Sequence, residues 1–364
     1  MAVTTLSPRL RKALGNPFFE ALAAPHGVSH WLEQVNLTWT IRSDRAIVTD
    51  VRHQTADAVT LTLAPVDDGK AQFLPGQYLQ VGVEIEGVTH TRCFSISCAA
   101  GRADRRLEIT VKRHDDGFVS SWLKAHAEPG LVLTISDPAG DFTLPSARPA
   151  HLVLVSGGSG ITPVMSMLRT LVAEEHAGRV TFLHFARTAD ELIFADELAL
   201  IDVDHDNVNV VTVFTREGGA HLSPAMLAEL DIDPAAALAF ACGPRDLVDA
   251  AIEIWSGAGN EDRLFVEYFQ PPAVDLDADE ASGAITFAAS GITVENDGRT
   301  LLEQAEAAGL APASGCRMGI CHTCPRRKTS GTVLDAVTGT RSATADEEIR
   351  ICVSVPCGDV ELDL

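Results

Sequence analysis

Positive charge is scarce in this sequence. Lysine and arginine number 28 against 50 aspartates and glutamates, for a formal net charge of −22 at pH 7. Nucleic-acid binding needs a basic face that neutralises phosphates, so this balance makes nucleic acid a poor partner for the whole molecule. The length of 364 residues allows two or three domains, because a typical domain has about 100–200 residues.

Long apolar runs are also absent. No stretch of about 18 apolar residues occurs, so we expect no transmembrane helix. The first residues, MAVTTLSPRLRK, lack the apolar core of a secretory signal, so we expect a cytoplasmic protein. In that compartment the eight cysteines are expected to be ligands or buried thiols rather than disulfides.

The hydrophobic pattern changes along the chain. Short alternating runs such as AVTLTLAP and YLQVGVEI, broken by turn signals, predict a small antiparallel β-barrel. Continuous apolar runs such as HLVLV and ALAFA, separated by helix-length segments, are typical of an α/β domain with a parallel sheet. We predict an N-terminal extension (1–43), a barrel (44–148), an α/β domain (149–270), an acidic linker (271–284) and an α+β domain (285–364).

The stretch CRMGICHTC holds Cys316, Cys321 and Cys324 in a C-x4-C-x2-C pattern, which is the spacing of plant-type [2Fe–2S] ligands. A fourth thiolate must come from further along the chain, where Cys352 and Cys357 are available. A zinc ribbon usually has two C-x2-C pairs, and a redox dithiol would leave the other cysteines unexplained. The pattern therefore favours an iron–sulfur cluster over both alternatives.

Residues 285–364 resemble a plant-type ferredoxin domain, which has a β-grasp-like fold. A hairpin (AITFAASGITVE), a helix (TLLEQAEAAG), the cysteine loop and the distal ICVSVPCGDVEL follow one another in the order of that family. The resemblance implies that Cys352 is the fourth ligand and that Cys357 is spare.

A one-electron cluster and a two-electron nicotinamide can be joined by a flavin. The stretch RCFSIS resembles the R-x-[YF]-S-x-x signature of the ferredoxin–NADP reductase family. The resemblance implies that Arg92 pairs with the flavin pyrophosphate, that Phe94 lies against the isoalloxazine ring and that Ser95 hydrogen-bonds flavin N5.

The stretches PGQYLQV and ITVKRHDDGFVSSWL resemble two further flavin elements of that family. The second of them implies FAD rather than FMN, although relatives with the same domain order use FMN. Backbone N–H groups at the start of a helix would face the pyrophosphate there. The residues implied are Val111, Gly117, Val119 and Ser120.

The stretch SGGSGITPVMSMLR follows an apolar strand, so Gly158 and Gly160 are expected in a phosphate-binding turn before a helix. In the family this segment places Thr162 near the nicotinamide. The stretch ACGP resembles a second family element, which implies that Cys242 lies near the hydride path. A small buried side chain is the alternative for this cysteine.

The stretch VEYF resembles the E-x-F ending of the family, which implies that Glu267 and Phe269 lie on the nicotinamide side of the flavin. Arg187 and Arg216 follow apolar strands and could bind a 2′-phosphate, whereas an acidic residue would favour NADH. We therefore expect NADPH as the electron donor, with NADH as the alternative.

From about residue 44 the chain resembles the reductase components of bacterial oxygenases and desaturases. The resemblance implies an oxidoreductase that passes electrons from NAD(P)H through flavin and cluster to an external iron protein. The stretch WLEQVNLTWTIRS resembles actinobacterial reductases of membrane fatty-acyl desaturases, so a desaturase or alkane hydroxylase is the first expected acceptor. A soluble aromatic-ring or phenylacetate-type oxygenase is the second. A redox sensor or binding module, and a zinc-stapled flavin reductase, are alternatives of other classes.

The stretch TLSPRLRKALGNPFFEALA predicts two short amphipathic helices separated at residues 15–17. We expect Phe18, Phe19 and Trp31 to pack onto the barrel. Peripheral docking on the inner face of a membrane is the alternative, because a basic island precedes them. That island consists of Arg9, Arg11 and Lys12.

Overall fold

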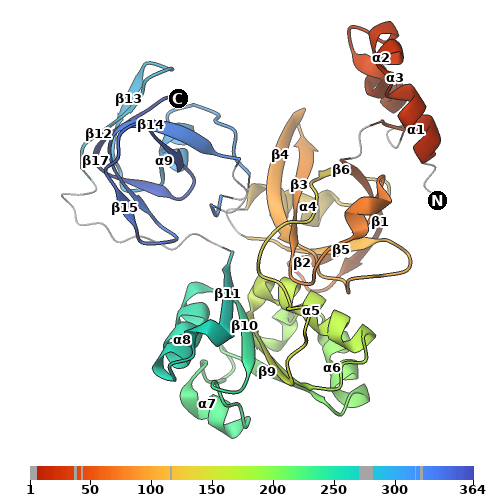
Figure 1. Cartoon of the computed structure of the whole chain (residues 1–364), viewed down its shortest axis with the longest axis vertical. Helices are drawn as coiled ribbons and strands as arrows, with labels where there is room; N and C mark the ends of the chain where they lie inside the picture. Colours follow the sequence, from red (N-terminus) through yellow and green to blue (C-terminus); the bar gives the residue numbers. More distant parts are fainter. Residues whose placement is uncertain are drawn as a thin grey trace. The chain divides into compact units, whose positions relative to one another are not determined.

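The structure, a computed structural model, describes residues 6–36, 39–41, 44–114, 117–269, 282–315, 317–319 and 323–364. Figure 1 draws three β-sheets in chain order, from orange through green to blue. The chain divides into two compact units. The first, Met1–His90 with Phe94–Glu267, holds the first two sheets, and the second, Thr91–Cys93 with Tyr268–Leu364, holds the third.

The first sheet is antiparallel, in the strand order β4-β3-β6-β1-β2-β5. An isolated bridge between Ile96 and Ile109 joins its two ends, so the sheet closes into the predicted barrel. Leu61, Leu63 and Val81, from the alternating runs, are fully buried in its core. The elements are β1 (Arg45–His53), β2 (Ala58–Pro65), η1 (Asp68–Ala71), β3 (Tyr78–Ile85), β4 (Val88–Ser95), β5 (Leu107–Lys112), α4 (Phe118–His126) and β6 (Val132–Ile135).

The second sheet has the order β11-β10-β7-β8-β9, and β10, β7, β8 and β9 pair in parallel, as the continuous apolar runs predicted. Val153 and Val155 pack on one face against Trp255 of α8, while α5 covers β7 and β10 from the other face (Figure 1). The elements are β7 (His151–Gly157), η2 (Gly158–Gly160), α5 (Ile161–Ala173), β8 (Arg179–Ala186), η3 (Ala189–Glu191), α6 (Ala195–Asp204), β9 (Val208–Phe214), α7 (Pro224–Glu229), β10 (Leu238–Gly243), α8 (Arg245–Gly257), η4 (Glu261–Arg263) and β11 (Leu264–Tyr268).

The third sheet has the order β13-β12-β17-β14-β15, with β16 on β14, and it confirms the predicted α+β class. Helix α9 starts at a capping box on Thr300, and its Leu301 and Leu302 are buried with Phe287 of the sheet. Most of the predicted linker lies outside the described residues. The elements are β12 (Ala284–Phe287), β13 (Ile292–Glu295), α9 (Leu301–Ala307), β14 (Pro325–Asp335), β15 (Arg341–Ser342), β16 (Glu347–Arg350) and β17 (Ser354–Leu362).

The N-terminal extension forms three helices, α1 (Pro8–Leu14), α2 (Pro17–Leu22) and α3 (Gly27–Val35). The break between α1 and α2 was predicted, and the third helix was not. None of the helices in the described part of the chain is both long and apolar enough to span a membrane.

The expected packing of the aromatic residues onto the barrel is wrong. Phe18, Phe19 and Trp31 are 65%, 42% and 53% exposed. The reason is that their contacts lie within the extension: Trp31 Nε1 donates to the Ala23 carbonyl at 2.9 Å, and the two phenylalanine rings meet edge to face. A polar contact reaches the barrel instead, where Arg11 Nη2 donates to the Val66 carbonyl at 2.6 Å.

Gly76, in the turn before β3, lies against the segment that follows β6 and against helix α5. It has a φ of +102°, and a Cβ there would overlap the Phe142 carbonyl oxygen and lie 2.6 Å from Met167 Cε on α5. Gly87 has a φ of +79° with nothing within 4 Å, so it shares the backbone conformation without the crowding.

We therefore expect Gly76→Ala to destabilise the first unit more than Gly87→Ala. Backbone strain costs about 1 kcal/mol at both positions, and overpacking adds roughly 1–3 kcal/mol at Gly76 alone. The measurement is the temperature at which bound flavin is released, followed by its fluorescence. Equal shifts for the two variants would contradict the close packing at Gly76.

Candidate redox site

The predicted phosphate turn lies against the end of strand β10. A Cβ on Gly160 would overlap the Cys242 carbonyl oxygen, and one on Gly157 would lie 2.7 Å from Pro244 Cδ. Only glycine permits this contact, so the structure brings the SGGSG and ACGP segments together. Gly158 has a φ of +53° and nothing within 4 Å of its missing Cβ. That open position fits a close approach by a ligand phosphate.

Helix α5 begins directly after this turn. Its N-cap is Gly160, which has no side chain to cap the first N–H groups. Thr162 is buried, and its hydroxyl donates to the Ser159 carbonyl at 3.1 Å. Backbone N–H groups at the start of a helix attract anions. The arrangement therefore fits the pyrophosphate of a nicotinamide nucleotide.

Cys242 and Glu267 lie on the neighbouring strands β10 and β11. Burial raises the pKa of the Cys242 thiol well above its usual value, and the charge of Glu267 adds to the effect. Burial also raises the pKa of Glu267 to about 8. Its Oε2 atom is inaccessible and has no hydrogen-bond partner among the described residues. Burial therefore favours the protonated form of this carboxyl group. Phe269 follows β11 and is half-buried.

The first flavin segment occupies the end of β4. Ser95 is buried, whereas Arg92 and Phe94 are half-buried. Phe94 packs against the barrel core. Arg92 Nη1 donates to the Thr91 carbonyl at 2.8 Å, which leaves other N–H groups of its guanidinium for a ligand.

The second flavin segment contains β5 and the start of α4. Val111 is enclosed in the barrel core, and its backbone pairs with Val59. Gly117 is the N-cap of α4, so the N-cap residue itself has no side chain to cap the N–H groups near Val119 and Ser120. The Ser120 hydroxyl donates to the Gly117 carbonyl at 3.2 Å. The start of α4 therefore fits the pyrophosphate of the flavin, just as the start of α5 fits that of the nicotinamide nucleotide.

The two arginines expected at the 2′-phosphate are adjacent. Arg216 N donates to the Arg187 carbonyl at 2.8 Å across the ends of β8 and β9. The Arg187 side chain forms an ion pair with Glu191 at 2.7 Å, and Lys112 reaches the same carboxylate at 3.1 Å. The Arg216 side chain is exposed. Arg216 is therefore the better placed of the two for an added phosphate.

Two of the four predicted cluster ligands are described. Cys324 and Cys352 are buried in one core, and Ile351 N donates to the Cys324 carbonyl at 3.4 Å. Cys316 and Cys321 lie outside the described residues. Cys357 is half-buried on β17 and takes no part in that core. Two buried thiols beside a loop with positive φ at Gly319 fit a cluster held by thiolates.

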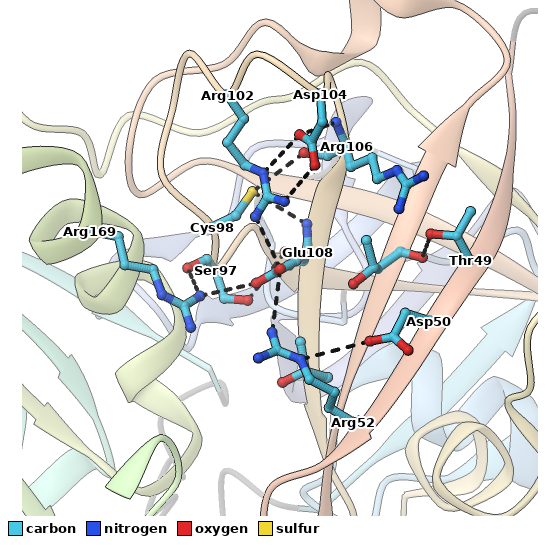
Figure 2. A network of polar contacts seen from close by, with 12 residues as sticks. Thr49, Asp50, Arg52, Ser97, Cys98, Arg102, Asp104, Arg106, Glu108 and Arg169 are labelled. Atoms are coloured by element: carbon cyan, nitrogen blue, oxygen red, sulfur yellow. Dashed lines mark hydrogen bonds and ion pairs between the residues drawn. The ribbon is translucent and has the colours of Figure 1, made fainter. Parts of the chain in front are cut away.

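Sequence reasoning missed a group of residues where α5 meets the barrel, which includes Ser97, Glu108 and Arg169 (Figure 2). A signal was present, because Ser166, Arg169 and Thr170 interrupt the apolar helix at i, i+3 and i+4. Polar residues at that spacing share one face of a helix. Their partners on a distant strand were not readable from the sequence.

Three family profiles match the chain in succession. They are "Oxidoreductase FAD-binding domain" at residues 46–144, "Oxidoreductase NAD-binding domain" at 154–253 and "2Fe-2S iron-sulfur cluster binding domain" at 285–357. The chain is therefore an NAD(P)H-dependent oxidoreductase with FAD and a [2Fe–2S] cluster. The sensor and zinc-stapled alternatives lose their support.

Curated relatives match over most of the chain. An "NADPH oxidoreductase" of Mycobacterium tuberculosis is 37% identical over 338 residues, covering 92% of this chain and 88% of the relative. A "Glycine betaine monooxygenase reductase subunit" of Pseudomonas aeruginosa is 31% identical over 319 residues, covering 80% and 87%.

A solved structure titled phthalate dioxygenase reductase has the same fold, with a TM-score of 0.62 at 24% identity over 88% of this chain and 97% of that one. The order of the three domains and the extent of the matches to relatives indicate the same family. The glycine-rich segment SGGSG and the flavin segments are located in the domains where that family has them. The chain belongs to the ferredoxin–NADP reductase family, among the members that carry a C-terminal plant-type [2Fe–2S] domain.

Proposed function

We propose that this reductase takes electrons from NADPH and delivers them to a membrane-bound iron oxygenase of the fatty-acyl desaturase or alkane hydroxylase kind. When bound, NADPH would supply hydride chemistry, FAD would couple two-electron to one-electron transfer, and the cluster would carry single electrons. The observation that carries the membrane-bound acceptor is the exposed apolar surface of the three N-terminal helices.

Within the site, we propose these roles for the residues described above. Arg92 pairs with the flavin pyrophosphate through guanidinium N–H groups other than the one that donates to Thr91. Ser95 donates a hydrogen bond at flavin N5 from the end of β4. Thr162 orients the nicotinamide from the start of α5, and Cys242 packs beside the hydride path as a neutral thiol. Glu267 offers a buried carboxyl group in the same region, whose pKa burial raises to about 8.

For the cluster, we propose Cys316, Cys321, Cys324 and Cys352 as ligands. The burial of Cys324 and Cys352 in one core supports this set over one that contains Cys357.

NADPH is proposed over NADH on two grounds. The adjacent Arg187 and Arg216 offer positive charge at the ends of β8 and β9, and a 2′-phosphate needs such charge. The M. tuberculosis relative is named an NADPH oxidoreductase.

The N-terminal extension exposes both apolar and basic side chains, which supports the proposal of a membrane-bound acceptor. Leu22 and Val35 are exposed together with the three aromatic side chains noted above. Exposed Arg9 and Lys12 lie close by in sequence. Apolar side chains beside cations are the features by which a short amphipathic helix binds an anionic membrane surface.

A second candidate acceptor is an oxygenase that acts on a small water-soluble substrate. The names of the glycine betaine monooxygenase reductase subunits favour it. This candidate does not require the extension to bind lipid, so the vesicle experiment below separates the two.

Replacement of the distal cysteines tests the ligand set. Cys352→Ser should remove the rhombic [2Fe–2S] EPR signal and most of the iron, because serine replaces a thiolate ligand. Cys357→Ser is the matched control and should retain both. FAD content should be unchanged in each variant. Loss of iron from the Cys357 variant would refute the assignment.

Steady-state kinetics test the nucleotide preference. Arg216→Ser should raise the KM for NADPH by roughly 10-fold or more, as expected when a hydrogen bond to a charged group is lost. The KM for NADH should change less than about twofold, since NADH has no 2′-phosphate. Arg187→Ser should have a smaller effect because Glu191 already pairs with this arginine. A parallel rise for both nucleotides would contradict this role.

Sedimentation with vesicles that contain anionic phospholipid tests the acceptor class. The wild-type protein should bind, and a Phe18→Ser, Trp31→Ser double variant should partition at least about 10-fold less, since each buried aromatic contributes about 1.5–3 kcal/mol. Val203→Ser removes an exposed apolar side chain from α6 and should bind like wild type. NADPH-dependent cytochrome c reduction should be unchanged. Wild-type protein that stays in the supernatant would favour the second acceptor.

A further inference from the structure

Helix α5 is joined to the barrel by a row of polar contacts, which we name the α5 seam. Its helix residues are Ser166, Arg169 and Thr170, which share one face of α5. Its barrel side is the segment 97–100, which begins two residues after the end of β4. The contacts are Ser166 Oγ donating to Cys98 O at 2.7 Å, Arg169 Nη1 donating to Ser97 O at 2.6 Å, and Ala100 N donating to Thr170 Oγ1 at 3.0 Å.

Arg169 is the centre of the α5 seam. Only 11% of its side chain is exposed. Its guanidinium forms a two-point pair with Glu197 of α6, at 2.7 and 2.5 Å, and lies 4.6 Å from the centre of the Phe194 ring. The nitrogen that reaches Ser97 also lies 3.3 Å from Glu108 of the barrel. The planar guanidinium of Arg169 is thus held by Glu197 in the α/β domain while it also hydrogen-bonds the barrel. Lysine has no planar group with several fixed N–H donors, so it cannot make both sets of contacts.

Glu108 is the matching group on the barrel. Figure 2 shows Arg52, Arg102 and Arg169 converging on its carboxylate, at 3.4, 3.1 and 3.3 Å. Its side chain is only 9% exposed. Its backbone also holds Ser97, whose N–H donates to the Glu108 carbonyl at 2.8 Å. The acceptor of the Arg169 hydrogen bond is therefore itself fixed to β5.

The α5 seam lies between the two segments proposed to hold the reacting groups. Ser97 is two residues after Ser95, which is proposed at flavin N5. Ser166 is about one helical turn after Thr162, which is proposed at the nicotinamide. Transfer between bound groups needs the reacting atoms about 3–3.5 Å apart, and a misplacement of about 1 Å can lower the rate about 100-fold.

We propose that Arg169 is a positioning residue for hydride transfer: through Ser97 and Glu108 it sets how closely the nicotinamide segment approaches the flavin segment. The inference rests on the proposed placement of the cofactors at Ser95 and Thr162. Arg169 does not itself touch the reacting atoms. A buried ion pair is weak evidence for stability, since desolvation offsets the attraction, but it can select one arrangement of the groups that it joins.

The test uses the full-length protein with FAD and cluster bound. The variants are Arg169→Gln, which removes the fork and the charge, and Arg169→Lys, which keeps the charge. Arg179→Gln is the matched control. Arg179 also joins a carboxylate and a backbone carbonyl, Asp231 at 2.8 Å and Leu230 at 2.7 Å, but both partners lie within the α/β domain.

Two measurements decide the outcome. Stopped-flow reduction by NADPH separates the limiting rate of flavin reduction from the nucleotide Kd, and the long-wavelength charge-transfer absorbance reports stacking of nicotinamide on flavin. Hydrogen–deuterium exchange of residues 97–100, measured without nucleotide, reports whether the contacts of the α5 seam remain formed. For Arg169→Gln we expect a limiting rate roughly 10- to 100-fold lower, a Kd within about twofold of wild type, weaker charge-transfer absorbance and faster exchange. The lysine variant should be intermediate, and Arg179→Gln should match wild type.

An Arg169→Gln protein that retains FAD and reduces it at the wild-type rate would overturn the inference. So would an effect on the Kd alone, or an equal loss of rate in Arg179→Gln. Failure of the proposed function looks different: flavin in the wild-type protein would not be reduced by NADPH or NADH, and the inference would then fall with the cofactor placement.

Discussion

The contact between helix α5 and the barrel is the constraint on which the first unit depends. Two domains with separate cores must present one bound cofactor to another at contact distance, and apolar packing alone allows small sliding motions between such surfaces. Polar contacts at this junction are directional and limit sliding. Ser166, Arg169 and Thr170 hydrogen-bond a segment that begins two residues after Ser95. The helix that starts at the proposed phosphate turn is thereby held to the segment that follows the strand proposed to contact the flavin.

At the N-terminal end of α5, glycine permits a second close contact between segments. The phosphate turn lies so close to the end of β10 that a Cβ on Gly157 or Gly160 would collide with Pro244 or Cys242. This contact aligns the start of α5 with the region of Cys242 and Glu267. The N-caps of α4 and α5 are also glycines, Gly117 and Gly160, which have no side chain to occupy the first N–H groups of the helix. Such N–H groups at a helix start favour an anionic ligand.

Positive charge is concentrated at a few places in the chain. The protein is acidic overall, with a formal net charge of −22. Arginine is nevertheless concentrated where a carboxylate is buried, around Glu108, and where an added phosphate would bind, at Arg187 and Arg216. The extension differs again, because exposed apolar side chains lie there with cationic ones.

The sequence by itself determined the fold class, the family and the cofactors, because these depend on local patterns. Alternation of apolar residues defines barrel strands such as β2 and β3, continuous runs define β7 and β8, and C-x4-C-x2-C is a spacing along one loop. The tertiary structure decided what depends on partners far apart in the chain. Arg169 and Glu108 are 61 residues apart, so neither signals the other in the sequence. The aromatic side chains of the extension were expected to be buried because they are apolar, yet whether a short helix finds a surface to cover depends on packing that its own residues do not specify.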